Sequence, residues 1–273
     1  MDFDVALSSL AVDPSAQFDA AQLCLLAAKD EYPNLDVAQY LERLDLLAVG
    51  AANHVHGTLE ERVAGLSHYL FDELRFRGNS QDYYDPDNSF LNRVVDRRLG
   101  LPITLSVLTA AVGARAGLAV SGVGLPGHFI VMARDGTEAI LFDPFHGGQA
   151  LTPADAEALV QQVTGQPFTL TPEWLIPVTP ARLMRRVLTN LKGVYLRRSD
   201  FERAGRTIAR LRQLDPSDVS EQRDLAVCLM QTGHPGPAID LLDEYLKQSP
   251  PGPEAEQAEQ LLRRARIEVA RWN

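Results

Sequence analysis

Residues 118–143 read LAVSGVGLPGHFIVMARDGTEAILFD, and this stretch decides the fold of the chain. It holds three short apolar runs, separated by Pro-Gly and by Asp-Gly. Apolar residues recur here at a period of two, which is typical of strands. Asp-Gly between alternating apolar runs is a strong hairpin signal. We therefore predict an antiparallel sheet whose two longest strands flank this turn.

A loop at Asp135-Gly136 would set the register of this hairpin. His128 would then stand directly opposite Asp143. Facing residues on neighbouring strands have Cβ atoms about 4.5–5.5 Å apart, so the imidazole can donate a hydrogen bond to the carboxylate. An aspartate in this position fixes the tautomer of the histidine and stabilises its cation, as in a nucleophile–base–acid triad. We predict that the two side chains are in contact.

The sequence around the hairpin indicates three parts. Residues 1–76 carry three amphipathic helical stripes, which predicts an N-terminal helical segment packed on the core. Residues 77–178 contain the strands and form the predicted core. Residues 179–273 read as helices throughout. The class is therefore α+β, with helices before and after the sheet.

The C-terminal helices show an internal repeat of 34 residues. Ala204 and Ala238 are separated by this period, as are Pro216 and Pro250. A small residue where two helices touch and a proline after the second helix are typical of tetratricopeptide repeats. An irregular helical tail is the alternative interpretation.

Several motifs spread over the core resemble a known family. They are NSFLN at 88–92, GLPITL at 100–105, LPGHF at 125–129, and DPF at 143–145 followed by two glycines. Together they resemble the SirB-like branch of the transglutaminase-like superfamily, over roughly residues 60–270. The resemblance implies a papain/transglutaminase-like core with an antiparallel sheet, flanked by N-terminal helices and a C-terminal helical-repeat array.

The resemblance also implies a cysteine nucleophile at the N-terminus of a helix, with His128 and Asp143 completing the triad. Counting from the glycines that flank the helix places this position at Pro102. A helix N-terminus lowers the pKa of a thiol, but proline has no nucleophilic group. Thr104 and Ser106 lie in the same helix and are the alternative nucleophiles. His146 is a further candidate for lining the same cleft.

Composition limits the remaining possibilities. A net charge of −10 argues against direct binding of nucleic acid. The acidic N-terminus does not resemble a signal peptide, and no apolar run is long enough for a membrane span, so we predict a cytoplasmic protein. Cys24 and Cys228 read as buried thiols, with a disulfide between them as the alternative. We predict no metal and no cofactor, and the oligomeric state is left open.

Charge is distributed unevenly along the chain. Residues 1–76 hold 13 acidic and 4 basic residues, whereas residues 181–213 hold 2 acidic and 10 basic ones. Four of these cations recur at near-helical spacing on one helix: Arg182, Arg185, Arg186 and Lys192. We interpret them as a surface for an acidic peptide or protein partner. A solvated face, or pairing with the acidic N-terminal helices, is the alternative.

Two functions follow from these features. The first is a catalytically degenerate transglutaminase-like protein that acts as a protein-interaction or regulatory module. The second is an amide hydrolase or acyl transferase, in which a hydroxyl or a water activated by His128 replaces the cysteine.

Overall fold

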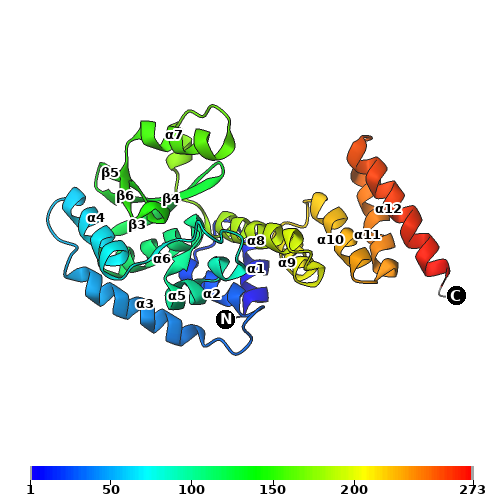
Figure 1. Ribbon diagram of the computed structural model, residues 1–273, viewed down its shortest axis with the longest axis horizontal. Coiled ribbons are helices and arrows are strands. Elements are labelled where there is room, and N and C mark those ends of the chain that lie inside the picture. The colour runs from blue at the N-terminus through cyan, green and yellow to red at the C-terminus, as the bar shows by residue number, and fades with distance from the viewer. Residues whose placement is uncertain (1, 272–273) are drawn as a thin grey trace. The chain divides into compact units, whose positions relative to one another are not determined.

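The computed structural model describes residues 2–271, which form two compact units (Figure 1). Residues 17–183 make up the first unit. The second joins the N-terminal residues up to Ala16 to the residues from Met184 onward. Each unit has its own buried residues and is described separately.

The 17–183 unit combines helices with a small sheet. Its α-helices are α2 (Ala20–Ala28), α3 (Val37–Ala52), α4 (Leu59–Ser67), α5 (Leu91–Arg97), α6 (Pro102–Arg115), α7 (Pro153–Thr164) and the first residues of α8 (Pro180–Arg197). A π-helical segment, η1 (His68–Glu73), and the 3-10 turns η2 (Pro86–Ser89), η3 (Pro144–His146) and η4 (Pro172–Leu175) lie between them. The strands are β1 (Arg77–Gly78), β2 (Leu99–Gly100), β3 (Ala119–Leu125), β4 (His128–Asp135), β5 (Glu138–Asp143) and β6 (Gln149–Leu151).

Four strands form an antiparallel sheet in the order β3-β4-β5-β6. Helices cover both faces, with α6 and α7 on opposite sides (Figure 1). The α7 face is an apolar cluster that includes Ile130, Met132 and Leu141. Phe129 and Phe142 alternate with these residues along the strands and are buried too. Burial on both faces explains why the central strands are apolar at nearly every position.

The register of the β4–β5 hairpin differs from the sequence-based prediction by two residues. Asp135 pairs with Glu138, so the loop is Gly136-Thr137 and not Asp135-Gly136. Gly136 has a φ of 56°, whereas Thr137 is not among the residues with positive φ. Glycine at the first loop position followed by an ordinary residue fits a type II′ turn, whereas a loop at Asp135-Gly136 would be a type I′ turn, with positive φ at both residues. A shift of two residues keeps every side chain on its predicted face, because the side-chain period of a strand is also two.

Helix α6 begins at Pro102 and is buried along most of its length. Proline suits this first position, because its fixed φ is helical and the missing N–H has no partner within the helix. The preceding Leu101 N–H donates to the Thr104 hydroxyl oxygen at 2.9 Å, which caps the helix. The N-terminus of α6 is therefore fixed by its own first turn.

The second unit consists of helices only, within the described residues. They are α1 (Phe3–Val12), α8 from Met184 onward, α9 (Phe201–Leu214), α10 (Ser220–Gln231), α11 (Pro235–Gln248) and α12 (Pro253–Ala270). Helix α1 lies against α9. There the Asp4 carboxylate pairs with Arg210, and Gln213 donates to the Asp4 carbonyl at 3.1 Å. One acidic residue of the N-terminal segment thus pairs with the basic block at 181–213.

The repeat positions have the burial that a tetratricopeptide array requires. Ala204 and Ala238 are both fully buried, which lets neighbouring helices approach closely. Pro216 and Pro250 follow the ends of α9 and α11 by two residues. Helices α10, α11 and α12 share one apolar cluster, in which α12 covers the last pair.

The predicted α+β class, with an antiparallel sheet, N-terminal helices and a C-terminal helical array, is confirmed. The boundaries at residues 76 and 178 remain a prediction. Among the described residues, none of the helices has the length and apolar character needed to cross a lipid bilayer.

Candidate functional site

His128 and Asp143 stand at the end of the hairpin away from its loop. His128 is the first residue of β4 and pairs with Leu125 across a turn at Pro126-Gly127. Gly127 has a φ of 68°, which glycine adopts without strain. Asp143 is the last residue of β5. The two side chains are buried, and His128 Nε2 lies 2.8 Å from Asp143 Oδ2.

The contact that the sequence predicts is therefore present, but not by the predicted pairing. With the observed register, Asp143 comes opposite Ile130, so it reaches His128 diagonally. Diagonal neighbours on one face of a sheet are about 7–8 Å apart, within reach of long side chains. The predicted register was wrong by two residues, an even number, so His128 and Asp143 still lie on the same face of the sheet.

Asp143 is held in place by several hydrogen bonds. The carboxylate oxygen Oδ1 accepts from the Phe145 N–H at 2.9 Å, and the main-chain carbonyl of Asp143 accepts from the Gly148 N–H at 2.8 Å. Burial alone would raise the pKa of Asp143, but hydrogen bonds and charge interactions with His128 and His146 outweigh burial and lower it. The group is therefore an ionised carboxylate at neutral pH.

His146 is a direct partner of the same carboxylate. Its Nδ1 lies 2.7 Å from Asp143 Oδ2, and its ring stacks on that of His128 with centroids 5.8 Å apart. Its side chain is 52% exposed, in contrast to that of His128 at 4%. The sequence suggested only that His146 lines the cleft. The 3-10 turn η3, directly after Asp143, brings it into contact.

Phe145 connects this pair to the N-terminus of α6. The space beside its ring is open only because residue 78 is glycine, since an added Cβ would lie 2.6 Å from the ring. Gly78 pairs with Gly100, two residues before Pro102. Strand β1 thus contacts Phe145 and pairs with residues just before Pro102, where the family resemblance places a nucleophile, and η3 also contacts α6 directly.

The two hydroxyls proposed as alternative nucleophiles are fully buried and hydrogen-bonded to the main chain. Thr104 Oγ1 lies 2.8 Å from the Asn88 carbonyl, and Ser106 Oγ lies 3.3 Å from the Phe129 carbonyl. A hydroxyl has one hydrogen to donate, and in each case a carbonyl accepts it. Either hydroxyl would have to break this bond before a base could activate it.

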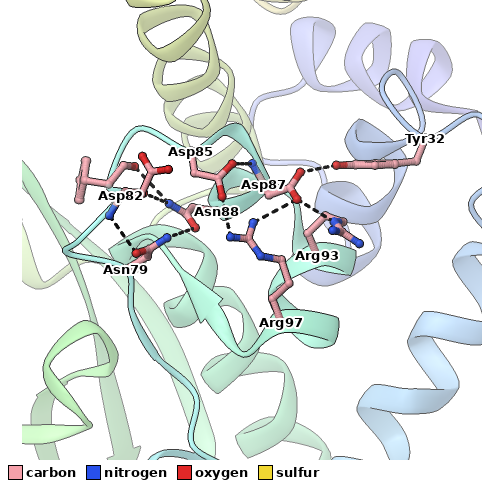
Figure 2. Close-up of polar contacts among 9 residues, drawn as sticks. Tyr32, Asn79, Asp82, Asp85, Asp87, Asn88, Arg93 and Arg97 are labelled. Atoms are coloured by element: carbon pink, nitrogen blue, oxygen red, sulfur yellow. Dashed lines mark hydrogen bonds and ion pairs between the residues drawn. The ribbon is translucent and has the colours of Figure 1, made fainter.

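Residues 82–87 form a loop that runs into η2 and carries Asp82, Asp85 and Asp87. Hydrogen bonds and ion pairs with neighbouring side chains hold this loop in place (Figure 2). The buried Asn88 side chain accepts from Asn79 at 3.0 Å and donates to the Asp82 carbonyl at 2.8 Å. Asp85 accepts from Arg97 at 2.6 Å.

Asp87 belongs to the same network and links it to Tyr32, four residues after the end of α2. Its carboxylate accepts from Tyr32 at 2.5 Å and from Arg93 at 3.0 Å (Figure 2). These contacts order the loop, and they give it a structural explanation that needs no ligand.

The predicted partner-binding cations have different surroundings. Arg185 pairs with Asp215 at 2.5 Å and with Asp218. Lys192 lies 2.7 Å from Glu221 and 2.6 Å from Asp224, with a side chain only 13% exposed. Arg182 and Arg186 complete the set, and Arg182 is exposed. The described pairs involve acidic residues of the repeat array, not those of the N-terminal helices.

Neither cysteine contacts the His128–Asp143 pair in the described contacts. Cys24 lies in α2 and Cys228 in α10, and both are free and buried. Burial raises the pKa of the Cys24 thiol to about 12 and that of the Cys228 thiol to about 11. Both are thiols, not thiolates, at neutral pH.

Comparison with known families agrees with this architecture. A family model described as the transglutaminase-like superfamily matches residues 38–189, which is more than half of the chain. The chain belongs to the transglutaminase-like superfamily. A tetratricopeptide-repeat model matches residues 191–263. The predicted transglutaminase-like core followed by tetratricopeptide repeats is confirmed.

Similar proteins include a UPF0162 protein of Xylella fastidiosa strain 9a5c, 34% identical, with 89% of this chain and 88% of that protein aligned. A UPF0162 protein of Vibrio cholerae is 25% identical over 83% of this chain and 82% of its own length. Part of this chain also resembles F-box only protein 21 of Homo sapiens, 30% identical over 46% of this chain and 20% of that protein. No solved structure matches the chain significantly.

Proposed function

We propose that this transglutaminase-like protein is catalytically degenerate and acts as a protein-interaction or regulatory module. The observation that carries the proposal is the chemistry of the α6 N-terminus. Pro102 occupies the predicted nucleophile position, and the nearby Thr104 and Ser106 hydroxyls donate to main-chain carbonyls. In such a pair the histidine can act as a base and the aspartate orients it. Acyl transfer through a covalent intermediate also needs a nucleophile.

The interaction part of the proposal is supported by the repeats. Tetratricopeptide repeats generally mediate protein–protein interaction, and a repeat model covers residues 191–263. We infer a partner with an acidic surface or peptide, because Arg182, Arg185, Arg186 and Lys192 concentrate positive charge on α8. Arg185 and Lys192 already form ion pairs, whereas Arg182 is exposed, so Arg182 is the better candidate for direct contact. The predicted cytoplasmic location and the three-part division belong to the same proposal.

Transfer of a fluorescent primary amine to a glutamine-containing protein tests the catalytic part. The native chain should give no product beyond that of His128→Ala, whose buried histidine is removed. Product that forms with the native chain and disappears in His128→Ala would contradict degeneracy.

Partner capture tests the interaction part. Extract from cells that express the chain is passed over the immobilised protein and over an Arg182→Glu variant, with Lys247→Glu as an exposed control on α11. We expect one protein to be retained by the native chain and by the control, and to be lost by Arg182→Glu. Equal retention by all three would contradict the proposed acidic contact.

The alternative, an amide hydrolase or acyl transferase, is favoured by the 2.8 Å contact between His128 and Asp143. In that case His128 would activate a water, or one of the two hydroxyls after its present bond breaks. Hydrolysis of a glutamine amide that depends on His128, without amine transfer, would favour this alternative.

A further inference from the structure

Three side chains of metal-ligand type converge where β4 begins and β5 ends. We propose that His128, Asp143 and His146 bind one divalent transition-metal ion of the zinc class. The proposal is independent of the interaction role, because it concerns a ligand of the hairpin and not a partner of the repeats.

The ligand atoms have the separations that such an ion needs. Asp143 Oδ2 lies 2.8 Å from His128 Nε2 and 2.7 Å from His146 Nδ1, and all three atoms are within 4.8 Å of one another. Ligand bonds of about 2.0–2.2 Å place adjacent ligand atoms roughly 2.9 Å apart in an octahedron and roughly 3.3 Å apart in a tetrahedron. Small rotations of the two rings therefore suffice to create the site.

The surroundings also suit an ion. The second carboxylate oxygen accepts the Phe145 N–H at 2.9 Å, which orients the carboxylate as outer-shell partners of metal ligands do. The side chain of His146 is 52% exposed, so an ion can reach the site and keep water in its remaining positions. Two of the three ligands are therefore buried and one is accessible to solvent.

Protons and the ion compete for the same atoms. In the hydrogen-bonded state, the ionised Asp143 can only accept, so both ring nitrogens that face it carry hydrogen. In the metal-bound state each ring presents a lone pair there and carries its hydrogen on the other nitrogen. An ion at this position would therefore bind the nitrogen through which Asp143 orients His128, and the pair would no longer act as a hydrogen-bonded dyad.

The donor set determines which ions fit. Two imidazoles and one carboxylate suit zinc, cobalt, nickel and ferrous iron, whereas calcium and magnesium prefer oxygen ligands. The sequence alone predicts no metal, and in it His128 stands 15 residues before Asp143. Only the folded hairpin and the η3 turn bring the three atoms together.

Cobalt and zinc binding to the full, untagged chain tests the proposal. After treatment with a chelator, the chain is dialysed against Co²⁺ or Zn²⁺, the bound metal is counted, and the visible absorption of the cobalt form is recorded. We expect one ion per chain. His146→Ala should weaken binding more than about 100-fold, beyond the usual loss from an outer-shell change. Because His146 is half exposed, this variant should keep its fold, which circular dichroism verifies.

A matched control comes from the other exposed histidine with carboxylate partners. His68 lies 3.1 Å from Asp72 and 3.2 Å from Glu73, with a side chain that is 56% exposed. His68→Ala should bind metal like the native chain. The proposal is overturned if the native chain binds neither ion, if His146→Ala binds as tightly as the native chain, or if only His68→Ala loses binding.

Discussion

Lys192→Met removes a cation from the interior of the repeat array. Lys192 Nζ lies 2.7 Å from Glu221 and 2.6 Å from Asp224 on α10. Burial alone would lower the pKa of Lys192, but its hydrogen bonds and charge interactions with the two carboxylates raise it. Without the ammonium group, both carboxylates lose this counter-charge, and Asp224 keeps its ion pair with Arg223 at 3.0 Å.

The size of the effect follows from exposure. The three side chains are 13%, 10% and 22% exposed for Lys192, Glu221 and Asp224. Exposed ion pairs contribute about 0.2–1 kcal/mol, whereas removal of one partner from a buried pair costs about 3–5 kcal/mol. With exposure this low, we expect a loss of about 2–4 kcal/mol.

Hydrogen–deuterium exchange resolved by peptide measures this loss where it occurs. A loss of about 2–4 kcal/mol corresponds to roughly 30- to 1,000-fold faster exchange in α8 and α10. Peptides from residues 17–183 serve as an internal reference. Lys247→Met is the matched control, because Lys247 is 72% exposed and its Glu244 partner lies at 3.4 Å. Equal exchange in the two variants would refute the reasoning about the buried pair.

Three further predictions concern other parts of the chain. Burial raises the pKa of Cys24 to about 12 and that of Cys228 to about 11. Both should react with iodoacetamide at pH 8 at least about 100-fold more slowly in the folded chain than in urea. Comparable rates in the two states would contradict their burial. Gly136→Ala should lower the free energy of unfolding by about 1–2 kcal/mol, because alanine is strained at a φ of 56°. An added Cβ has open space, so the cost comes from the backbone alone. An unchanged melting temperature would contradict this. Burial would raise the pKa of Asp87, but Tyr32 and Arg93 lower it, so its stabilising effect is present above the unfolded pKa and is lost as pH falls through the folded one. The difference in unfolding free energy between the native chain and Asp87→Asn should therefore be largest near pH 6 and shrink below about pH 4; a difference that does not change with pH would contradict this.

The sequence predicts the sheet and the 34-residue repeat because each shows as a regular period in the residues. It predicts the His128–Asp143 contact for a partly wrong reason. Both turn types at this hairpin use Gly136, so sequence alone does not distinguish a loop at 135–136 from one at 136–137. Side-chain alternation protected the contact from that error.

Two features depend on structure that no local pattern encodes. His146 reaches the carboxylate only because a 3-10 turn follows Asp143. The charge pattern that marked Lys192 as a binding residue could not reveal its two partners, because Glu221 and Asp224 come from a helix two elements later. In both cases the deciding contact is tertiary.

A thiol placed at residue 102 tests the central claim most directly, namely that the site keeps its His128–Asp143 pair but has lost its nucleophile. Pro102→Cys is compared with Pro102→Cys/His128→Ala by the rate of alkylation at pH 6, with the native chain as background because its own thiols have raised pKa values. The helix N-terminus and the histidine should both favour a thiolate. Because Pro102 is buried, the comparison between the two variants carries the test: we predict faster alkylation of Pro102→Cys than of the double variant, and none in the native chain. Equal rates with and without His128 would contradict the claim.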